Sequence, residues 1–353
     1  MTDDLPAPLQ SILGAGIELP LPPLWAARND GLDAGTSILL GIVLALLGTA
    51  YGVGMWLRRR PDTAVNPALV RTFTLRVRAW WVLYAVLTAA FLLPIPHAVT
   101  VLFFLISFWA LREFITLTPT RIGDHRALFW VFFVFTPLQY GLVGMGIGYY
   151  SLYSIVIPVY AFLFIPARVA LAGDYKRFLE RAAKIQSGLF VCVYALSYAP
   201  ALLDLQINRS NGEPWEGSRA GLLLFLIMTV QMNDVFQYAW GKLLGRRIIA
   251  PAINASRTRE GFLGGITSTA LLGTALWWMT PFQPAEAAAL AVVVGIMGFA
   301  GSMTLSAIKR DRGVKDYGTL VEGHAGILDR VDSLCFAAPV FFHVTYFYFA
   351  KVH

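Results

Sequence analysis

The chain has 353 residues, of which 57% are hydrophobic and only 14% are charged. A soluble domain carries roughly 25% charged residues, so this composition excludes an ordinary soluble protein and indicates a polytopic membrane protein. The formal net charge of +7 does not predict a nucleic-acid partner, because the cytoplasmic loops of membrane proteins carry an excess of Lys and Arg.

The beginning of the sequence is rich in proline and slightly acidic, and we expect residues 1–35 to form an extracytoplasmic N-terminal segment. It has no basic stretch of the kind that opens a cleaved signal peptide. The two cysteines, Cys192 and Cys335, lie in apolar runs. A disulfide framework is therefore excluded, and both are expected to be small buried side chains.

Apolar stretches close to the ~20 residues needed to cross a bilayer recur along the rest of the chain. They predict an all-α polytopic membrane protein with about ten transmembrane helices, at 36–57, 78–95, 98–117, 127–146, 150–171, 186–203, 220–241, 261–280, 284–307 and 334–350.

The charges in the connections support this count. If alternate loops are cytoplasmic, that side holds all of the 28 Lys and Arg except Arg28, Arg209, Arg219 and Lys351. Such a bias is the positive-inside pattern, and it predicts that both termini are extracytoplasmic. A miscounted span would scramble the separation.

We divide the chain into an N-terminal scaffold and a C-terminal region. Residues 36–203 form an N-terminal transmembrane scaffold of about six helices, and 204–353 form the C-terminal region with cytoplasmic loops 242–260 and 308–333. Glycines at small-xxx-small spacing allow membrane helices to pack closely. They predict a tightly packed core of the last four spans and stand at Gly261, Gly264, Gly265, Gly295, Gly298 and Gly301.

The densest charge lies near the end, where Ser306-Ala-Ile-Lys-Arg-Asp-Arg-Gly-Val-Lys-Asp is followed by Gly323-His-Ala-Gly-Ile-Leu-Asp-Arg-Val-Asp. Basic side chains neutralise phosphate oxygens, and carboxylates hold Mg²⁺ together with substrate phosphates. Asp329 and Asp332 share one helical face, although an ordinary acidic first turn of a helix is an alternative reading. Lys315 and Asp316 could also simply pair with each other.

A second candidate is Asp234, close to the cytoplasmic end of the seventh span. An ionisable group at that depth is costly unless it faces protein, water or a cation. Either it bonds to a neighbouring helix end, or it points into the same water-filled site as the loop 308–333, which we call the signature loop. No GxxxxGK[ST], HExxH or CxxC motif is present in the sequence.

These residues resemble the phosphatidate cytidylyltransferase (CDP-diacylglycerol synthase) family. Its C-terminal signature, S-x-x-K-R-x4-K-D followed by H-G-G-x-x-D-R-x-D, is matched by Ser306, Lys309, Arg310, Lys315, Asp316, His324, Gly326, Asp329, Arg330 and Asp332. The upstream patterns D-x-x-A-Y-x-x-G-[KR] and S-P-x-K-T-x-x-G are matched more loosely by Asp234, Tyr238, Gly241, Lys242, Thr258 and Gly261, with Arg257 in place of Lys. The resemblance covers about 150–350.

The resemblance implies a CTP-dependent enzyme that converts phosphatidic acid to CDP-diacylglycerol and pyrophosphate at the cytoplasmic face of a bacterial inner membrane, as a possible homodimer among membrane lipids. It implies three sets of residues. The catalytic set is Asp329, Lys309, Arg310, Lys315 and His324; the substrate-binding set is Asp234, Tyr238, Lys242, Arg257, Thr258, Ser306 and Arg330; the Mg²⁺ ligands are Asp329, Asp332 and Asp316.

The sequence also departs from the family pattern. Ser302 replaces an acidic metal ligand, which puts a second metal ion in doubt. Asn254 replaces a Ser, Ala325 replaces a Gly, and Glu322 stands where Pro or Gly is usual. A divergent relative that is non-catalytic, or that binds or converts another lipid phosphate, is therefore an alternative. A transporter is disfavoured, because the charges gather at one surface and no inverted repeat is visible.

Overall fold

The computed structural model of this chain describes residues 32–59, 67–93, 95, 97–117, 120–209, 212–215, 217–318 and 326–350. Almost all of the predicted N-terminal segment lies outside the described residues. His324, Ala325 and Glu322, which belong to the signature loop, lie outside them as well.

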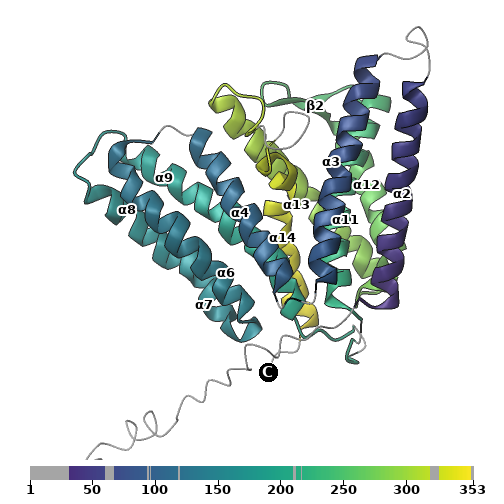
Figure 1. Ribbon diagram of the computed structural model, residues 1–353, viewed down its shortest axis with the longest axis horizontal. Helices are drawn as coiled ribbons and strands as arrows, with labels where there is room; N and C mark the ends of the chain where they lie inside the picture. Colours follow the sequence, from purple (N-terminus) through teal and green to yellow (C-terminus); the bar gives the residue numbers. More distant parts are fainter. Residues whose placement is uncertain are drawn as a thin grey trace, which may run out of the picture.

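The described part of the chain contains ten helical stretches, and they coincide with the ten predicted spans (Figure 1). Most of the helix ends lie within a few residues of the predicted ends. Three of them are composite, with short 3₁₀ or π segments between α segments. The single helices are α2 (Ala34–Arg58), α3 (Pro67–Leu92), α4 (Ala98–Leu117), α11 (Arg219–Leu243), α12 (Arg259–Ala275), α13 (Pro284–Asp311) and α14 (Leu328–Phe349).

The composite stretches run from Ile122 to Gly144, from Ile147 to Ala170 and from Phe178 to Asp204. Their segments are η1 (Ile122–Asp124), α5 (His125–Trp130), η2 (Val131–Phe135), α6 (Thr136–Gly144), η3 (Ile147–Tyr149), α7 (Tyr150–Ile155), η4 (Val156–Ala161), α8 (Phe162–Ala170), α9 (Phe178–Leu189), η5 (Phe190–Ala195), α10 (Leu196–Ala201) and η6 (Leu202–Asp204). A further 3₁₀ turn, η7 (Trp277–Met279), follows α12.

Seven of these stretches are long and apolar enough to cross a bilayer by length and composition: α2, α4, the three composite stretches, α11 and α13. The chain is thus an all-α polytopic integral membrane protein, as its composition predicts. The side of the membrane on which its termini lie stays a prediction.

Two prolines account for part of the irregularity in the composite stretches. A proline has no N–H to donate along a helix, and π segments accommodate the resulting gap. Pro137 follows the π segment η2, where the Val131 carbonyl accepts the Thr136 amide and also, at 2.8 Å, the Thr136 hydroxyl. Pro158 lies within η4. The break between the first two stretches falls at Gly146, whose φ of 96° favours glycine.

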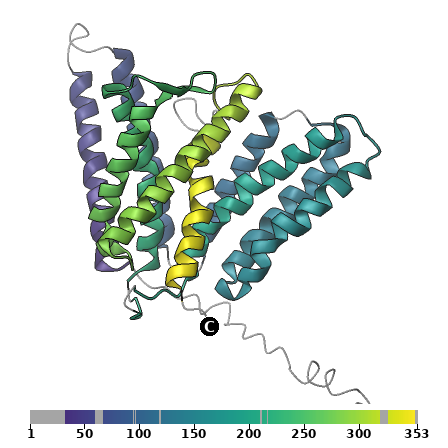
Figure 2. The same ribbon diagram turned by 180° about the vertical axis from the view of Figure 1, so that it is seen from behind.

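Helix α14 lies at the centre of the molecule. Figures 1 and 2 show it between α4 with the three composite stretches on one side and α11–α13 with α2 and α3 on the other. It contacts α13, α11, α10, η5 and α4. Both groups of helices therefore meet on the helix that carries Asp329 and Asp332.

Glycines bring α11, α12, α13 and α14 into close contact, as their spacing predicts. A Cβ atom on Gly264 of α12 would lie 2.6 Å from the Trp240 ring of α11, and one on Gly301 of α13 would lie 2.6 Å from the Asp332 carbonyl oxygen of α14. Because real Cβ atoms do not approach so closely, these positions require glycine. The polar ends of the four helices are thereby fixed relative to one another.

A small antiparallel hairpin joins α11 to α12, and the sequence analysis did not predict it. Strands β1 (Ile248–Ala250) and β2 (Asn254–Thr258) pair Ile248 with Thr258 and Ala250 with Asn254. Glu260 accepts hydrogen bonds from the Arg246 and Arg247 amides at 3.0 and 3.2 Å and so fixes the hairpin to the start of α12. The hairpin matters because β2 carries Arg257.

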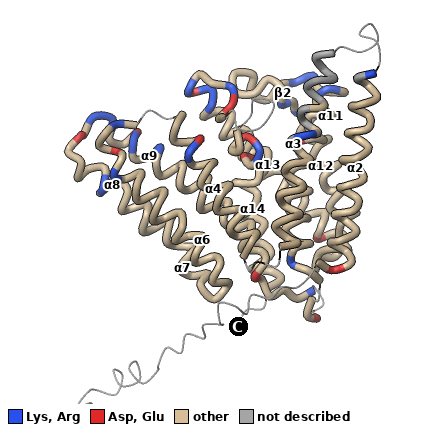
Figure 3. Tube along the Cα trace, in the orientation of Figure 1, with Lys and Arg blue, Asp and Glu red and all other residues tan. Residues whose placement is uncertain are grey.

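Most basic residues gather at one end of the molecule. Figure 3 shows Lys and Arg concentrated at the end that carries β2 and the loop after α13, with few at the opposite end. The separation read from the sequence is therefore also a separation in space.

Candidate functional site

Arg257 is the centre of a polar cluster formed by α11, β2 and α13. Its Nη2 atom donates to Asp234 Oδ1 at 2.6 Å and to Ser302 Oγ at 3.0 Å. Its Nη1 atom donates to Gln237 Oε1 at 2.8 Å. The Arg257 side chain is 13% exposed and that of Asp234 is 28% exposed, so the pair is largely sheltered but still reaches solvent through the carboxylate.

Ser333 connects this cluster to α14. Its hydroxyl donates to Asp234 Oδ2 at 2.7 Å and lies 3.3 Å from Asp332 Oδ1, which also accepts the Ser333 amide at 2.7 Å. Two carboxylates from different helices thus meet at one hydroxyl. They repel each other, and the nearby charges of Lys309 and Arg257 attract Asp332.

A second network surrounds Asp329 in the first turn of α14. Lys309 Nζ donates to its Oδ1 at 2.7 Å, and the amides of Tyr317 and Gly326 donate to its Oδ2 at 2.8 and 2.9 Å. Lys309 also lies 5.3 Å from the centre of the Tyr317 ring. In this arrangement Asp329 holds the described ends of the signature loop against α13.

Glu113 of α4 is a member of the site that the sequence analysis missed. Its side chain is buried, and its two oxygens accept the amides of Ile327 and Leu328 at 3.0 and 2.9 Å. Negative charge at a helix N-terminus is favourable. An ionisable residue inside the apolar run 98–117 was the signal that could have revealed it.

Gln237, Ser302 and Ser333 were also absent from the predicted site residues. Gln237 and Ser302 both contact Arg257, and Ser333 joins the two carboxylates. Neutral polar side chains on apolar helices give no pattern of their own in one sequence. Their role becomes visible only when the helices are packed.

The other predicted site residues are spread around these two networks. Thr258 is the N-cap of α12 and accepts the Gly261 amide at 3.1 Å, and Ser306 is buried on α13. Tyr238 and Lys242 form an exposed cation–π pair with 5.8 Å between the ammonium and the ring centre. Arg310 donates to the carbonyl oxygens of Ile253 and Val314, Gln231 donates to the Arg330 carbonyl, and Lys315 and Asp316 are exposed.

The structure therefore joins Asp234, Arg257 and Asp332 in one hydrogen-bonded cluster and Lys309 and Asp329 in another, and the Lys309 charge acts on Asp332. It places Tyr238, Lys242, Arg310, Lys315 and Asp316 on more exposed surface. His324 lies outside the described residues. The roles assigned to all of these residues remain predictions.

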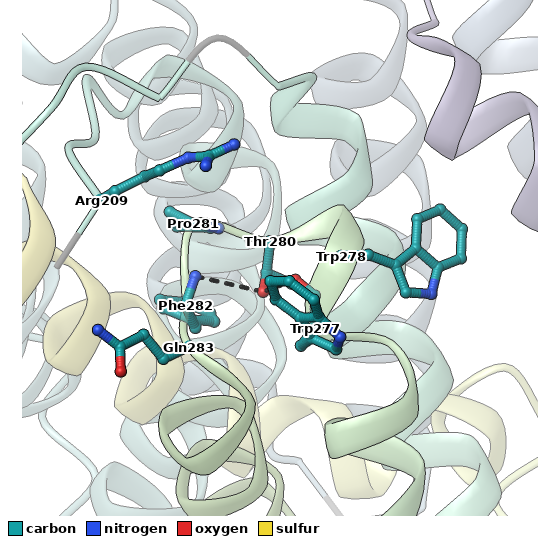
Figure 4. A pocket seen from close by; sticks show the side chains of 7 residues that line it. All are labelled: Arg209, Trp277, Trp278, Thr280, Pro281, Phe282 and Gln283. Atoms are coloured by element: carbon teal, nitrogen blue, oxygen red, sulfur yellow. Dashed lines mark hydrogen bonds between the residues drawn. The ribbon is translucent and has the colours of Figure 1, made fainter. Parts of the chain in front are cut away.

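A cavity of about 280 Å³ lies at the turn between α12 and α13. Arg257 precedes the opposite end of α12, and Lys309 lies near the opposite end of α13. Figure 4 shows its lining side chains, which are Arg209, Trp277, Trp278, Thr280, Pro281, Phe282 and Gln283. None of the predicted site residues is among them. Half-exposed tryptophans at a helix turn are typical of a membrane–water interface, so we do not assign the chemistry to this cavity.

Two carboxylates of the cluster are candidate ligands for a metal ion. Within the described ranges, no group of three or more His, Cys, Asp and Glu side chains is arranged to hold a metal ion. Asp234 and Asp332 nevertheless converge on one hydroxyl, and Mg²⁺ is commonly held by one or two carboxylates with substrate phosphates. These residues fit one divalent cation that a phosphate ligand would help to hold.

Comparison with known proteins agrees with this chemistry. The sequence profile of the cytidylyltransferase family matches residues 74–348. The chain is 39% identical over 272 residues to the uncharacterized protein YnbB of Escherichia coli, covering 76% of this chain and 86% of that protein.

Two further relatives carry a named activity. The phosphatidate cytidylyltransferase of Synechocystis is 34% identical over 204 residues, or 51% of this chain and 69% of that protein. The enzyme of the same name from Aquifex aeolicus is 39% identical over 121 residues, or 34% of this chain and 45% of that protein.

Proposed function

This chain belongs to the cytidylyltransferase family, and we propose that it transfers CMP from CTP to phosphatidic acid, giving CDP-diacylglycerol and pyrophosphate. An oxygen of the lipid phosphate attacks the α-phosphorus of CTP. The new P–O bond joins lipid phosphate to CMP, and the bond to the β-phosphate breaks as pyrophosphate leaves. The likeness to enzymes named phosphatidate cytidylyltransferase supports this substrate pair.

The observation that carries the proposal is that four elements form two adjacent charged networks. Asp234, Arg257 and Asp332 belong to one, and the Lys309–Asp329 pair forms the other, whose Lys309 charge acts on Asp332. Transfer between two phosphates needs alignment of the reactants and neutralisation of their charge more than it needs a nucleophile from the protein. Arg257 and Lys309 supply fixed positive charge at the cluster. The basic end of the molecule would attract both anionic substrates.

Asp234 and Asp332 are the residues that would hold Mg²⁺, which when bound would neutralise charge on the triphosphate. Asp329 has a different task in this proposal. By holding Lys309 and the amides of Tyr317 and Gly326, it would fix the described ends of the signature loop relative to α13. We place this reaction at the cytoplasmic face of a bacterial inner membrane, because the basic end is the cytoplasmic one under the positive-inside rule.

The proposal is tested with purified full-length protein, CTP labelled at the α-phosphate, phosphatidic acid and Mg²⁺. We expect a labelled CDP-lipid, at least 100-fold less of it with Asp332→Asn, and an unchanged rate with Arg209→Gln at the opposite end. Parallel reactions with other lipid phosphomonoesters identify the lipid. Absence of labelled lipid with every acceptor would overturn the proposal, and a product only with another lipid would replace phosphatidic acid as the substrate.

A further inference from the structure

Three side chains that depart from the family pattern contact one another in this chain. Arg257 stands where the pattern has Lys, Ser302 where it has an acidic residue, and Gln237 where D-x-x-A-Y has Ala. The Arg257 guanidinium donates to both of the others, at 2.8 Å to Gln237 Oε1 and at 3.0 Å to Ser302 Oγ. The departures therefore form one structural unit.

The geometry of the unit is specific to arginine. A guanidinium presents five N–H donors in a rigid plane, whereas a lysine ammonium presents three donors on a flexible stem. Arg257 uses this plane to reach acceptors on α11 and α13 at once, and the third acceptor is Asp234. A lysine at this position could not hold all three acceptors in the same directions.

The charge of the unit also differs from that of the family pattern. Ser302 removes one negative charge next to the guanidinium, and Gln237 adds none. Arg257 then satisfies one oxygen of Asp234, while the other oxygen accepts the Ser333 hydroxyl. A metal ion bound to Asp234 on the side facing Ser302 would lie next to the Arg257 guanidinium. The two positive charges would repel each other at this short distance.

Gln237 contributes a second observation. Its side chain is buried, with 3% of its surface exposed, and its Nε2 atom has no hydrogen-bond partner among the described residues. Leaving a buried donor unpaired is unfavourable. An amide donor held next to Arg257 would gain its partner from the oxygen of a bound phosphate.

We propose that Arg257, held by Gln237 and Ser302, is a built-in cation that takes the place of a second metal ion, so that each chain binds one divalent cation with its nucleotide. The inference rests on the proposed function for the identity of the nucleotide. Arg257 and Gln237 Nε2 then bind phosphate oxygens directly, and the single metal ion lies with Asp234 and Asp332.

The test counts bound metal ions and does not depend on turnover. Full-length protein in detergent is titrated with Mn²⁺ in the presence of a CTP analogue that cannot be cleaved between its α- and β-phosphates. Electron paramagnetic resonance measures free Mn²⁺, and a protein-free titration corrects for the ions bound by the analogue. We expect one Mn²⁺ per wild-type chain and two per chain in Q237A/R257K/S302D, which restores the family pattern.

Arg259→Lys is the matched control, because it makes the same change two residues away on a side chain outside the cluster, and it should still bind one Mn²⁺. Two ions in the wild-type chain would overturn the proposal without reference to any variant. One ion in a folded triple variant would overturn it as well. If wild type binds one ion with the analogue but makes no CDP-lipid, the proposed function fails and the built-in cation stands.

Discussion

Glu113 of α4 accepts a hydrogen bond of 2.9 Å from the backbone amide of Leu328, the first residue of α14. The two residues are 215 positions apart in the sequence. This contact ties a helix of the N-terminal half to the start of the helix that carries Asp329 and Asp332. The first six stretches therefore do more than surround the C-terminal region, because one of them fixes the position of its acidic residues.

Replacing Glu113 by alanine should lower both stability and activity. The Ile327 and Leu328 amides would lose their acceptors in a buried place, which costs about 1–3 kcal/mol for each unsatisfied group. Glu113→Gln keeps one acceptor oxygen and should be intermediate. Thermal unfolding in detergent and the rate of CDP-lipid formation measure the two effects. An alanine variant with native values for both would contradict the role of this contact.

Asp329→Asn should reduce turnover at least 100-fold and also lower the unfolding temperature. An asparagine has one acceptor oxygen where Asp329 uses two, and it removes the charge that pairs with Lys309. The partly buried ammonium of Lys309 would then lose the counter-ion that it contacts. The matched control is Asp311→Asn, because the Asp311 side chain is 69% exposed at the end of α13.

The outcome separates two roles for Asp329. If turnover and the unfolding temperature both fall, the result supports a structural role in which Asp329 holds Lys309 and the signature loop. A fall in turnover with an unchanged unfolding temperature would instead favour direct contact with metal or substrate, as the sequence analysis predicts for this residue.

The sequence predicted much of the fold because a bilayer imposes a simple rule. Every span needs enough apolar residues to cross it, and the loops record their side by their charge. The ten helical stretches, seven of them long and apolar enough to cross a bilayer, and the close helix packing at Gly264 and Gly301 followed from such local patterns. The β1–β2 hairpin did not, since a three-residue strand next to a basic loop carries no distinctive alternation.

The site was predictable only where it follows a motif. Asp234, Lys309, Asp329 and Asp332 are charged residues at spacings that resemble a known family. The partners that orient them were missed, because the contact of Glu113 with Leu328 and that of Arg257 with Gln237 depend on how distant helices pack. Contacts between residues far apart in the chain cannot be predicted from one sequence, because the identity of one residue does not indicate which residue it will contact.

Gly301→Ala should separate α13 from α14. The added Cβ would lie 2.6 Å from the Asp332 carbonyl oxygen, a backbone atom that cannot rotate away. Overpacking of this kind costs about 1–3 kcal/mol. Because Ser302 and Asp332 flank the contact, we expect the CDP-lipid rate to fall at least tenfold. Thermal unfolding and the labelled-CTP assay provide the measurements.

Gly141→Ala on α6 is the control for this change. A Cβ atom there would have no neighbour within 4 Å, and alanine favours a helix over glycine by up to ~1 kcal/mol. This variant should unfold at the same or a slightly higher temperature and keep its activity. Equal behaviour of the two variants would show that the α13–α14 contact tolerates an added methyl group.

The loops between the composite stretches provide a test of stability away from the site. Arg181 of α9 pairs with Asp124 of η1 at 2.6 Å, and the two side chains are 4% and 1% exposed. Asp174, in the loop before α9, lies 3.2 Å from Arg181 and is partly exposed. A hydrogen bond from Arg121 is the main cause that holds the pKa of Asp174 below its usual value.

The lowered pKa of Asp174 predicts the direction in which the stability of the fold changes with pH. Because the carboxyl of Asp174 is more acidic in the folded protein than in the unfolded chain, its charge stabilises the fold at neutral pH. That contribution is lost as the pH falls through the acidic range. The unfolding temperatures of wild type and Asp174→Asn should therefore differ slightly at pH 7 and converge in acid. A difference that grows in acid would contradict this assignment.

Asp124→Asn should be far more damaging than Asp174→Asn at pH 7. Removing one partner of a buried ion pair leaves the other charge uncompensated and costs about 3–5 kcal/mol. Arg181 Nε and Nη2 both donate to Asp124, and an asparagine can neither accept both bonds equally well nor balance the charge. Thermal unfolding compares the two variants directly. If they unfold at the same temperature, the Arg181–Asp124 pair does not hold these loops together.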